Sequence, residues 1–207
     1  MKKLLSVVSV VCLLSLIFCF PASAVSEKEV LFVVETSGNT ITVDVNTEFN
    51  CGGIQGVLSY DGGEIVYNSA VLATDLSDYN TPNNSFSNSS GATKVALVCD
   101  ATNGVNGNLA TITYESEANT PALFNFGSLK AFSANGSKLT NVKSVVVFYG
   151  DTNDDGLLNI LDLVRFKKVL AKSAIVPTGK ERNFDLDKNG QKNASDIIML
   201  ISKLLAK

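Results

Sequence analysis

Histidine and tryptophan are absent from the 207-residue sequence. Without histidine, the chain has neither Ser-His-Asp nor Cys-His catalysis, and no imidazole ligand for zinc. Without tryptophan, it lacks the aromatic side chain with the largest stacking surface. Glycoside hydrolysis needs two carboxylates about 5–10 Å apart in a cleft, whereas Glu64, Glu115 and Glu117 are scattered along the sequence. We therefore expect no enzymatic activity.

Long apolar runs are also scarce. The longest, Leu4–Phe20, follows Lys2 and Lys3 and precedes Ala22-Ser23-Ala24. This order of charged, apolar and small residues is typical of a secretory signal peptide. We expect residues 1–24 to be removed and the protein to be secreted, either free or on a cell-surface complex. No other stretch approaches the roughly 20 apolar residues of a membrane-spanning helix, so we expect no membrane partner.

Cysteine is rare in the remaining chain, which contains Cys51 and Cys99. An even number of cysteines in an exported protein is compatible with a disulfide, and two separate thiols buried in a sheet fit equally well. Neither cysteine belongs to a Cys-x-x-Cys pair, so we expect neither a zinc site nor thiol catalysis.

Charge is distributed unevenly along the chain. Without the signal segment, 15 basic residues face 20 acidic ones, for a net charge of −5. Residues 25–150 contain 12 acidic and 5 basic residues, and residues 151–207 contain 8 acidic and 10 basic ones. Neither part has the strongly basic character of a nucleic-acid-binding surface.

Residues 25–148 have the pattern of β-structure. Short runs rich in Val, Ile, Thr and aromatic residues alternate with Gly, Asn, Asp and Ser clusters about every ten residues. Such spacing predicts a β-sandwich, with a long surface loop at Asp78–Ala92. The predicted strands are residues 30–35, 40–45, 54–60, 64–67, 94–99, 109–114, 122–126 and 142–148.

The pattern changes at Gly150. Two helix-like runs follow, Leu161–Lys172 and Ile197–Lys207, and each is preceded by an acidic loop. Tyr149-Gly150 is the whole linker, so we expect the two parts of the chain to be held close together.

The acidic loops form an internal repeat. Asp151–Asp162 and Asp185–Asp196 both fit the pattern D-x-[DN]-x-[DN]-G-x-x-N-x-x-D, which is an EF-hand calcium loop with Asp in its last position. Calcium takes six to eight oxygen ligands at about 2.4 Å, and alternate side chains of a tight loop can converge on it. Gly156 and Gly190 stand at position six, where the chain must turn sharply.

We therefore expect two bound Ca²⁺ ions. Acid-rich loops can also be simple solvated turns or helix caps, but two matches in register, each leading into an apolar helix, favour calcium. Magnesium prefers fewer protein ligands. The second loop has Asn189 at position five and should bind more weakly. The predicted ligands are Asp151, Asn153, Asp155, Asn159, Asp162, Asp185, Asp187, Asn189, Asn193 and Asp196, with backbone carbonyls from Leu157 and Gln191.

Neither loop is preceded by a helix-forming sequence, which distinguishes the repeat from an ordinary EF-hand. With its duplicated loops, missing entering helices and C-terminal location, the segment 150–207 resembles a dockerin of the cellulosome type. The resemblance implies two antiparallel loop-helix halves, each organised by one Ca²⁺, that bind a cohesin on another protein. The recognition positions implied by the family are Ile160, Leu161, Lys167, Lys168, Ala194, Ser195, Ile201 and Ser202.

The two halves differ at every one of these positions, which argues against a symmetric, two-way binding mode. Other apolar helix residues, including Val164 and Ile198, are expected to form a small shared core. The run 197–205 nevertheless has more apolar side chains than so small a domain can bury, so part of this helix should face a partner.

The β-rich segment 25–149 resembles a cohesin. The resemblance rests on Ile41–Val45, Gly53–Asp61 and Gly107–Tyr114, which occur in the order and spacing of that family. It implies a jelly-roll sandwich that binds a dockerin through one sheet face. The strands expected to supply this face are those around residues 55–60, 94–99 and 109–114.

Together, these features predict a mainly β chain with a small all-α tail, acting as a non-catalytic adaptor of a cellulosome-like assembly. The tail would dock on a cohesin-bearing scaffold, and the sandwich would accept a dockerin-bearing protein. The alternatives for the sandwich are a carbohydrate-binding module, with polysaccharide as partner, or an inert spacer. A row of exposed aromatics on one sheet face would favour sugar, and a flat face without them would favour protein.

Overall fold

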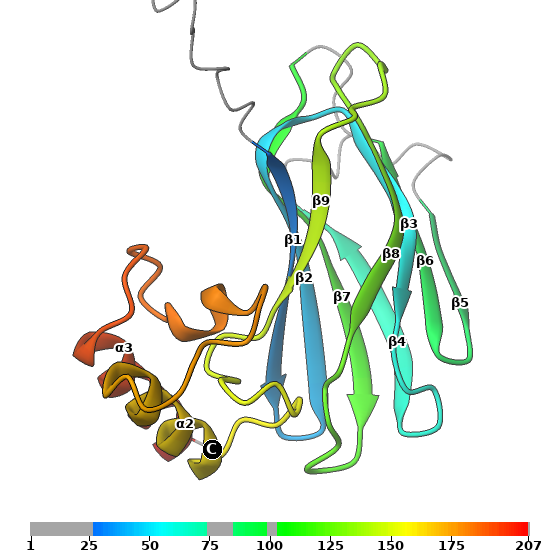
Figure 1. Cartoon of the computed structure of the whole chain (residues 1–207). Helices are drawn as coiled ribbons and strands as arrows, with labels where there is room; N and C mark the ends of the chain where they lie inside the picture. Colours follow the sequence, from blue (N-terminus) through cyan, green and yellow to red (C-terminus); the bar gives the residue numbers. More distant parts are fainter. Residues whose placement is uncertain (1–26, 74–84, 99–102, 207) are drawn as a thin grey trace, which may run out of the picture.

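The computed structural model of the chain describes residues 27–73, 85–98 and 103–206. The predicted signal peptide and Cys99 lie outside these residues. The described part consists of a β-sandwich with a small helical domain packed beside one of its sheets (Figure 1). None of its helices is both long and apolar enough to cross a membrane. The predicted fold class, a mainly β sandwich followed by a small helical domain, is confirmed.

Nine strands form two sheets. The five-stranded sheet has the order β4-β7-β2-β1-β9, and the four-stranded sheet has the order β5-β6-β3-β8. All pairings are antiparallel except that of β1 with β9, which is parallel. The strands are β1 Lys28–Ser37, β2 Thr40–Cys51, β3 Gly53–Ser59, β4 Ile65–Leu72, β5 Ser85–Ser89, β6 Ala92–Val98, β7 Val105–Ser116, β8 Asn125–Phe132 and β9 Val142–Val147.

The structure corrects the predicted strands at two places. Ser85–Ser89 was expected to be part of a loop but forms β5, because its backbone pairs with β6 although its side chains have little β preference. The strand expected at residues 122–126 is instead β8, which starts at Asn125. A bulge near Ser128, whose φ is 59°, disguises the alternation of β8 in the sequence.

The core lies between the two sheets and is built by alternate side chains of each strand. Phe32 of β1 stacks on Phe126 of β8 with ring centroids 4.0 Å apart. Tyr114 is fully buried, and its hydroxyl donates a hydrogen bond to Thr93 Oγ1 at 3.0 Å. Burial raises the pKa of Tyr114. Tyr60 packs edge-on against the same ring and is partly buried at the margin of the core.

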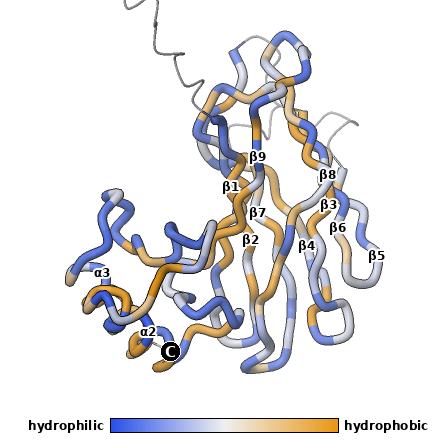
Figure 2. The backbone as a smooth tube through the Cα atoms, viewed as in Figure 1, coloured by the Kyte–Doolittle hydropathy of each residue, from blue (hydrophilic) through white to orange (hydrophobic). Residues whose placement is uncertain are grey.

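The tail comprises helix α2 (Ile160–Leu170), the 3₁₀ turn η2 (Glu181–Phe184) and helix α3 (Ala194–Leu205). Phe166 and Phe184 meet edge to face at 5.1 Å, and both are fully buried together with Leu200. Hydrophobic residues lie along β1, β9 and both helices, whereas the loops of the tail are largely hydrophilic (Figure 2). The apolar side chains of the tail are continuous with the core of the sandwich.

Candidate metal centre and docking surfaces

The first acidic loop (151–162) folds its backbone around its own carboxylates. Asp151 Oδ1 accepts a hydrogen bond from the Asp155 N–H at 3.2 Å, and its Oδ2 accepts one from the Gly156 N–H at 2.9 Å. Asn153 Oδ1 accepts a bond from the Asp155 N–H at 3.1 Å. The side chains at positions one and three are therefore held inside the turn.

Asp162 closes this loop from the first turn of α2. Its Oδ1 accepts a hydrogen bond from the Thr152 N–H at 2.9 Å, and its Oδ2 accepts one from the Asn159 N–H at 2.8 Å. Asn159 in turn accepts from the Leu161 N–H at 2.7 Å and caps the helix. A carboxylate here also suits the positive end of the helix dipole. Asp162 thus ties the loop to the helix that follows it.

The second loop repeats these bonds. Asp185 Oδ2 accepts from the Gly190 N–H at 2.9 Å. Asp196 Oδ1 accepts from the Leu186 N–H at 2.8 Å, and its Oδ2 accepts from the Asn193 N–H at 2.9 Å. The same spacing of residue types has therefore produced the same local fold in both halves of the tail.

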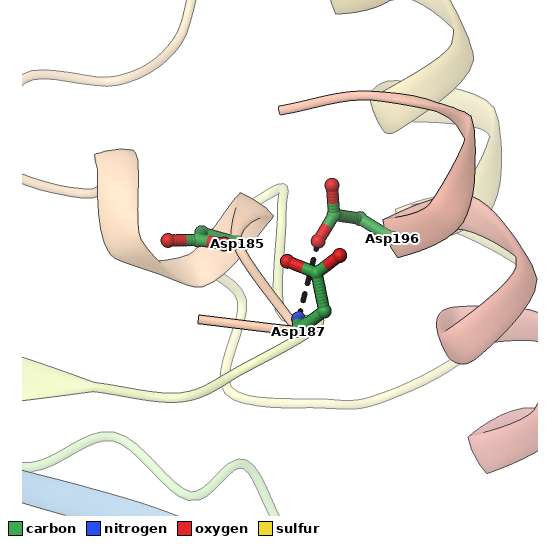
Figure 3. Close-up of side chains that lie close together, drawn as sticks. All are labelled: Asp185, Asp187 and Asp196. Carbon is green, nitrogen blue, oxygen red and sulfur yellow. Dashed lines mark hydrogen bonds between the residues drawn. The ribbon is translucent and has the colours of Figure 1, made fainter. Parts of the chain in front are cut away.

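Three carboxylates of the second loop converge. Asp185, Asp187 and Asp196 each place one oxygen within 4.8 Å of the others. Asp196 reaches from α3 towards Asp187 and accepts its backbone N–H at 3.2 Å (Figure 3). Several oxygen donors gathered in one tight loop are the environment that Ca²⁺ prefers.

Burial shows that the residues of both loops fit a cation. The exposed fraction is 2% for Asp151 and 0% for Asp162 and Asp196. Among the described residues, no Lys or Arg forms an ion pair with any of these three carboxylates. Burial raises the pKa of Asp151 to about 6 and also raises that of Asp162. Buried carboxylates cost free energy unless a cation compensates them, and Ca²⁺ would supply that charge.

Sequence reasoning missed one role of Asn159 and Asn193. Both residues cap the following helix through a capping box, in which the Asp three positions later bonds back to the cap. The Asn-x-x-Asp spacing at a helix start was the signal for this role. Each amide oxygen has two lone pairs, so capping leaves room for a metal or water contact. The remaining predicted ligands, Asp155, Leu157, Asn189 and Gln191, occupy loop positions five and seven.

The first loop is packed against the sandwich. The Ala122 N–H donates a hydrogen bond to the Gly156 carbonyl at 2.7 Å. Phe148, Tyr149 and Leu158 are buried at this junction. The second loop borders a crevice along the five-stranded sheet, and its Gly190 is exposed. These contacts hold the two parts of the chain close together, as the short linker predicted.

Arg182 of η2 fastens the tail to the five-stranded sheet. It forms ion pairs with Glu29 of β1 and with Glu48 of β2, the latter at 3.0 Å. Leu31 points away from the sandwich core but is only 6% exposed, because it lines a crevice together with Tyr149 and Arg182. The tail therefore covers part of the outer face of this sheet.

The predicted recognition residues of the tail lie on its surface. Ile160 and Leu161 are 62% and 58% exposed. Val164 and Ile198 were expected in the core, but they are 45% and 63% exposed, so that expectation was wrong. The tail is too small to cover both sides of its helices. Of the other predicted residues, Ile201 is partly buried, and Lys167, Lys168, Ala194, Ser195 and Ser202 are exposed.

The outer surface of the four-stranded sheet, called here the four-stranded face, is made mostly of small and polar side chains, with Val57 and Val98 as its larger apolar ones. Phe132 is partly buried at its edge, and no aromatic side chain of the described residues is exposed. Residues 109–114 were expected to contribute to the same face. They belong to β7 in the other sheet, so that prediction was wrong. The face consists of Gln55, Val57, Ser59, Ser85, Ser87, Ser89, Ala92, Lys94, Ala96, Val98, Asn125, Gly127 and Lys130.

Comparison with known proteins identifies the tail. Residues 149–205 match the family model of the dockerin type I domain, which confirms the resemblance predicted from the loops. No curated protein matches the chain.

The solved structures that match the chain include cohesins. The solution structure of CaCohA2 from Clostridium acetobutylicum has a TM-score of 0.47 and 16% identity, over 61% of this chain and 93% of that one. The second type II cohesin module from the adaptor scaffoldin ScaA of Acetivibrio cellulolyticus has a TM-score of 0.44 and 14% identity, over 58% and 94%. The Coh-OlpA–Doc918 cohesin–dockerin complex from Clostridium thermocellum has a TM-score of 0.44 and 14% identity, over 58% and 98%.

Proposed function

We propose that the chain is an exported, non-catalytic adaptor that joins two components of a cellulosome-like assembly. In this proposal residues 1–24 are a signal peptide, residues 25–149 a cohesin-like sandwich and residues 150–207 a dockerin. The tail binds a cohesin on a scaffold, and the sandwich accepts a dockerin-bearing protein. The observation that carries the proposal is the dockerin match over two loops that bury the carboxylates of Asp151, Asp162 and Asp196.

The proposed role of calcium is structural. Asp151 and Asp185 accept hydrogen bonds from the middle of their loops, and Asp162 and Asp196 accept them from the start, so each pair sets the path of its loop. Ca²⁺, when bound, would neutralise these carboxylates and add its binding free energy to folding. The loops then hold α2 and α3 in the orientation that presents Ile160, Leu161 and Ile198 to a cohesin.

For the sandwich, the geometry favours a protein partner over a sugar. The tail partly covers the outer surface of the five-stranded sheet, whereas the four-stranded face lies on the side away from α2 and α3 (Figure 1). Binding of crystalline polysaccharide usually relies on exposed aromatic rings, and the described residues present none. Protein–protein interfaces are closely packed, and a surface made mostly of small side chains permits such a close approach.

A binding experiment with the whole exported chain tests both halves of the proposal. The immobilised protein would be exposed to a panel of cohesins, to a panel of type I dockerins, and to insoluble cellulose and xylan, in Ca²⁺ and in EGTA. We expect retention of one or more cohesins and dockerins in Ca²⁺ only, and no retention on polysaccharide.

Two controls locate the contacts. The double variant Asp151→Ala/Asp185→Ala should lose cohesin binding, whereas Lys192→Ala, an exposed change in the second loop, should retain it. Binding to polysaccharide without any dockerin would make the sandwich a carbohydrate-binding module. Retention of cohesins alone would leave the sandwich as a spacer.

A further inference from the structure

The two outer surfaces of the sandwich differ in charge. The five-stranded sheet presents carboxylates, of which Glu35, Glu48 and Glu115 are exposed, and its Lys143 is paired with Glu27 and Glu29. The four-stranded face presents two exposed lysines, Lys94 and Lys130, and none of its described residues is acidic. A chain segment with a net charge of −7 therefore has one surface of the opposite sign.

The acidic surface is already engaged by the tail of the same chain. Arg182 pairs with Glu29 and Glu48, and Lys203 lies 4.0 Å from Glu35. The basic tail therefore compensates the acidic sheet within one molecule, and the four-stranded face remains as the surface of the sandwich for an external partner.

The two lysines are well placed to select that partner. Lys94 of β6 pairs in register with Val57 of β3, and Lys130 of β8 pairs with Gln55 of the same strand. They thus stand on opposite sides of β3, surrounded by small side chains. Within the described residues neither lysine forms an ion pair. Both ammonium groups are available to a ligand.

The α2 half of the chain's own tail has the wrong charge for this face. Its exposed helix surface presents Lys167 and Lys168 beside Ile160 and Leu161, and the one carboxylate of α2, Asp162, is fully buried. Docking of this surface on the four-stranded face of a second copy would place lysines opposite lysines. Like charges across an interface suppress the wrong partner.

We propose that the four-stranded face accepts a dockerin-bearing protein whose recognition helix presents carboxylates, and that Lys94 and Lys130 prevent this chain from docking on copies of itself. The inference rests on the proposed function and adds the chemistry of the partner. It explains how a protein that has both a dockerin-binding face and a dockerin can join two different components instead of forming a head-to-tail chain of copies.

The test uses the whole exported chain in Ca²⁺ with paired dockerin probes. Within each pair, the recognition positions carry Glu in one probe and Lys in the other. We expect the acidic probes to bind about ten-fold more tightly at low salt, with the difference shrinking as salt screens the charges. Lys94→Glu/Lys130→Glu should reverse this preference and should self-associate in sedimentation experiments, because the new carboxylates match Lys167 and Lys168.

The single variants Lys94→Glu and Lys130→Glu should each weaken the preference for acidic probes. Lys172→Glu is their matched control, because it makes the same charge change in the tail, away from the face. It should leave the preference unchanged. Equal or tighter binding of the basic probes, or self-association of the unmodified chain, would overturn the inference. Neither result would contradict the proposal that the sandwich binds a dockerin. If no probe of either charge binds in Ca²⁺, the proposed function of the sandwich fails, and the inference fails with it.

Discussion

The two acidic loops, 151–162 and 185–196, have the same residue pattern and nearly the same internal hydrogen bonds, but their surroundings differ. In the first loop Gly156 is buried and bonded to Ala122 of the sandwich. In the second loop the equivalent Gly190 is exposed. Their acidic residues differ as well, since Asp155 stands at position five of the first loop and Asn189 at that of the second.

Because the two loops share a residue pattern, they share a local geometry. The pattern does not determine how much each loop contributes to contacts with the rest of the protein. The first loop combines a proposed metal site with part of the junction with the sandwich, whereas the second loop is chiefly a proposed metal site. Loss of order in the first loop should therefore loosen the junction, and loss of order in the second should stay within the tail.

Removal of calcium should have the largest effect, because it acts on both loops at once. In EGTA, or in Asp151→Ala/Asp185→Ala, we expect loss of most of the helical signal of α2 and α3, since metal binding supplies much of the folding free energy of such loops. Far-UV circular dichroism measures this loss, with Lys192→Ala as the control. An unchanged helical signal in EGTA would contradict a structural role for the metal.

Alanine at the two loop glycines sharpens the comparison. Gly156 and Gly190 have φ values of 77° and 81°, so each Gly→Ala change introduces backbone strain of about 1 kcal/mol. At Gly156 the new Cβ would also lie 2.8 Å from Ala122 N, whereas at Gly190 nothing lies within 4 Å. We expect Gly156→Ala to lower the free energy of unfolding by about 2–3 kcal/mol and Gly190→Ala by about 1 kcal/mol. Equal losses in urea unfolding would show that the sandwich does not constrain the first loop.

Replacement of Arg182 tests the junction between tail and sandwich without changing a residue of either acidic loop. Because its side chain is 37% exposed, replacement by Ala should cost only about 1 kcal/mol, and less in high salt. A double-mutant cycle with Glu48→Ala measures the pair directly. Lys172→Ala, elsewhere on the tail surface, should have little effect. Coupling near zero would mean that the ion pair does not hold the tail in place.

The helix caps should show the smallest difference between the halves. Asn159→Ala and Asn193→Ala should each cost about 1 kcal/mol, because each removes one equivalent capping bond. Urea unfolding at saturating Ca²⁺ gives the cost, and calcium titration shows whether affinity also falls. Costs that differ by more than about 1 kcal/mol would indicate that the caps, too, depend on the sandwich.

Much of the tail could be predicted from the sequence, because its organisation is local. The spacing of acids and the glycine at position six determine the loop within twelve residues, and the structure places Asp151 and Asp185 at equivalent points of equivalent hydrogen-bond networks. The exposure of Val164 and Ile198 could not be predicted, because it depends on which helix side the rest of the tail covers.

The sandwich was predictable as a class but not in detail. Alternation in Thr40–Val45 indicates a strand with one buried side. It does not indicate which strand becomes its neighbour. For that reason β7 was placed in the wrong sheet, and β5, which depends on its pairing with β6, was taken for a loop.

By itself the sequence determined the two acidic loops, the helices that follow them and the β-rich character of the first part, because short-range spacing controls turns, caps and alternation. Only the tertiary structure decided that Gly156 lies against Ala122, that Arg182 meets Glu29 and Glu48, and that Lys94 and Lys130 share one open face. These contacts join residues far apart in the chain. They depend on how whole sheets and helices pack, and no short pattern in the sequence records that packing.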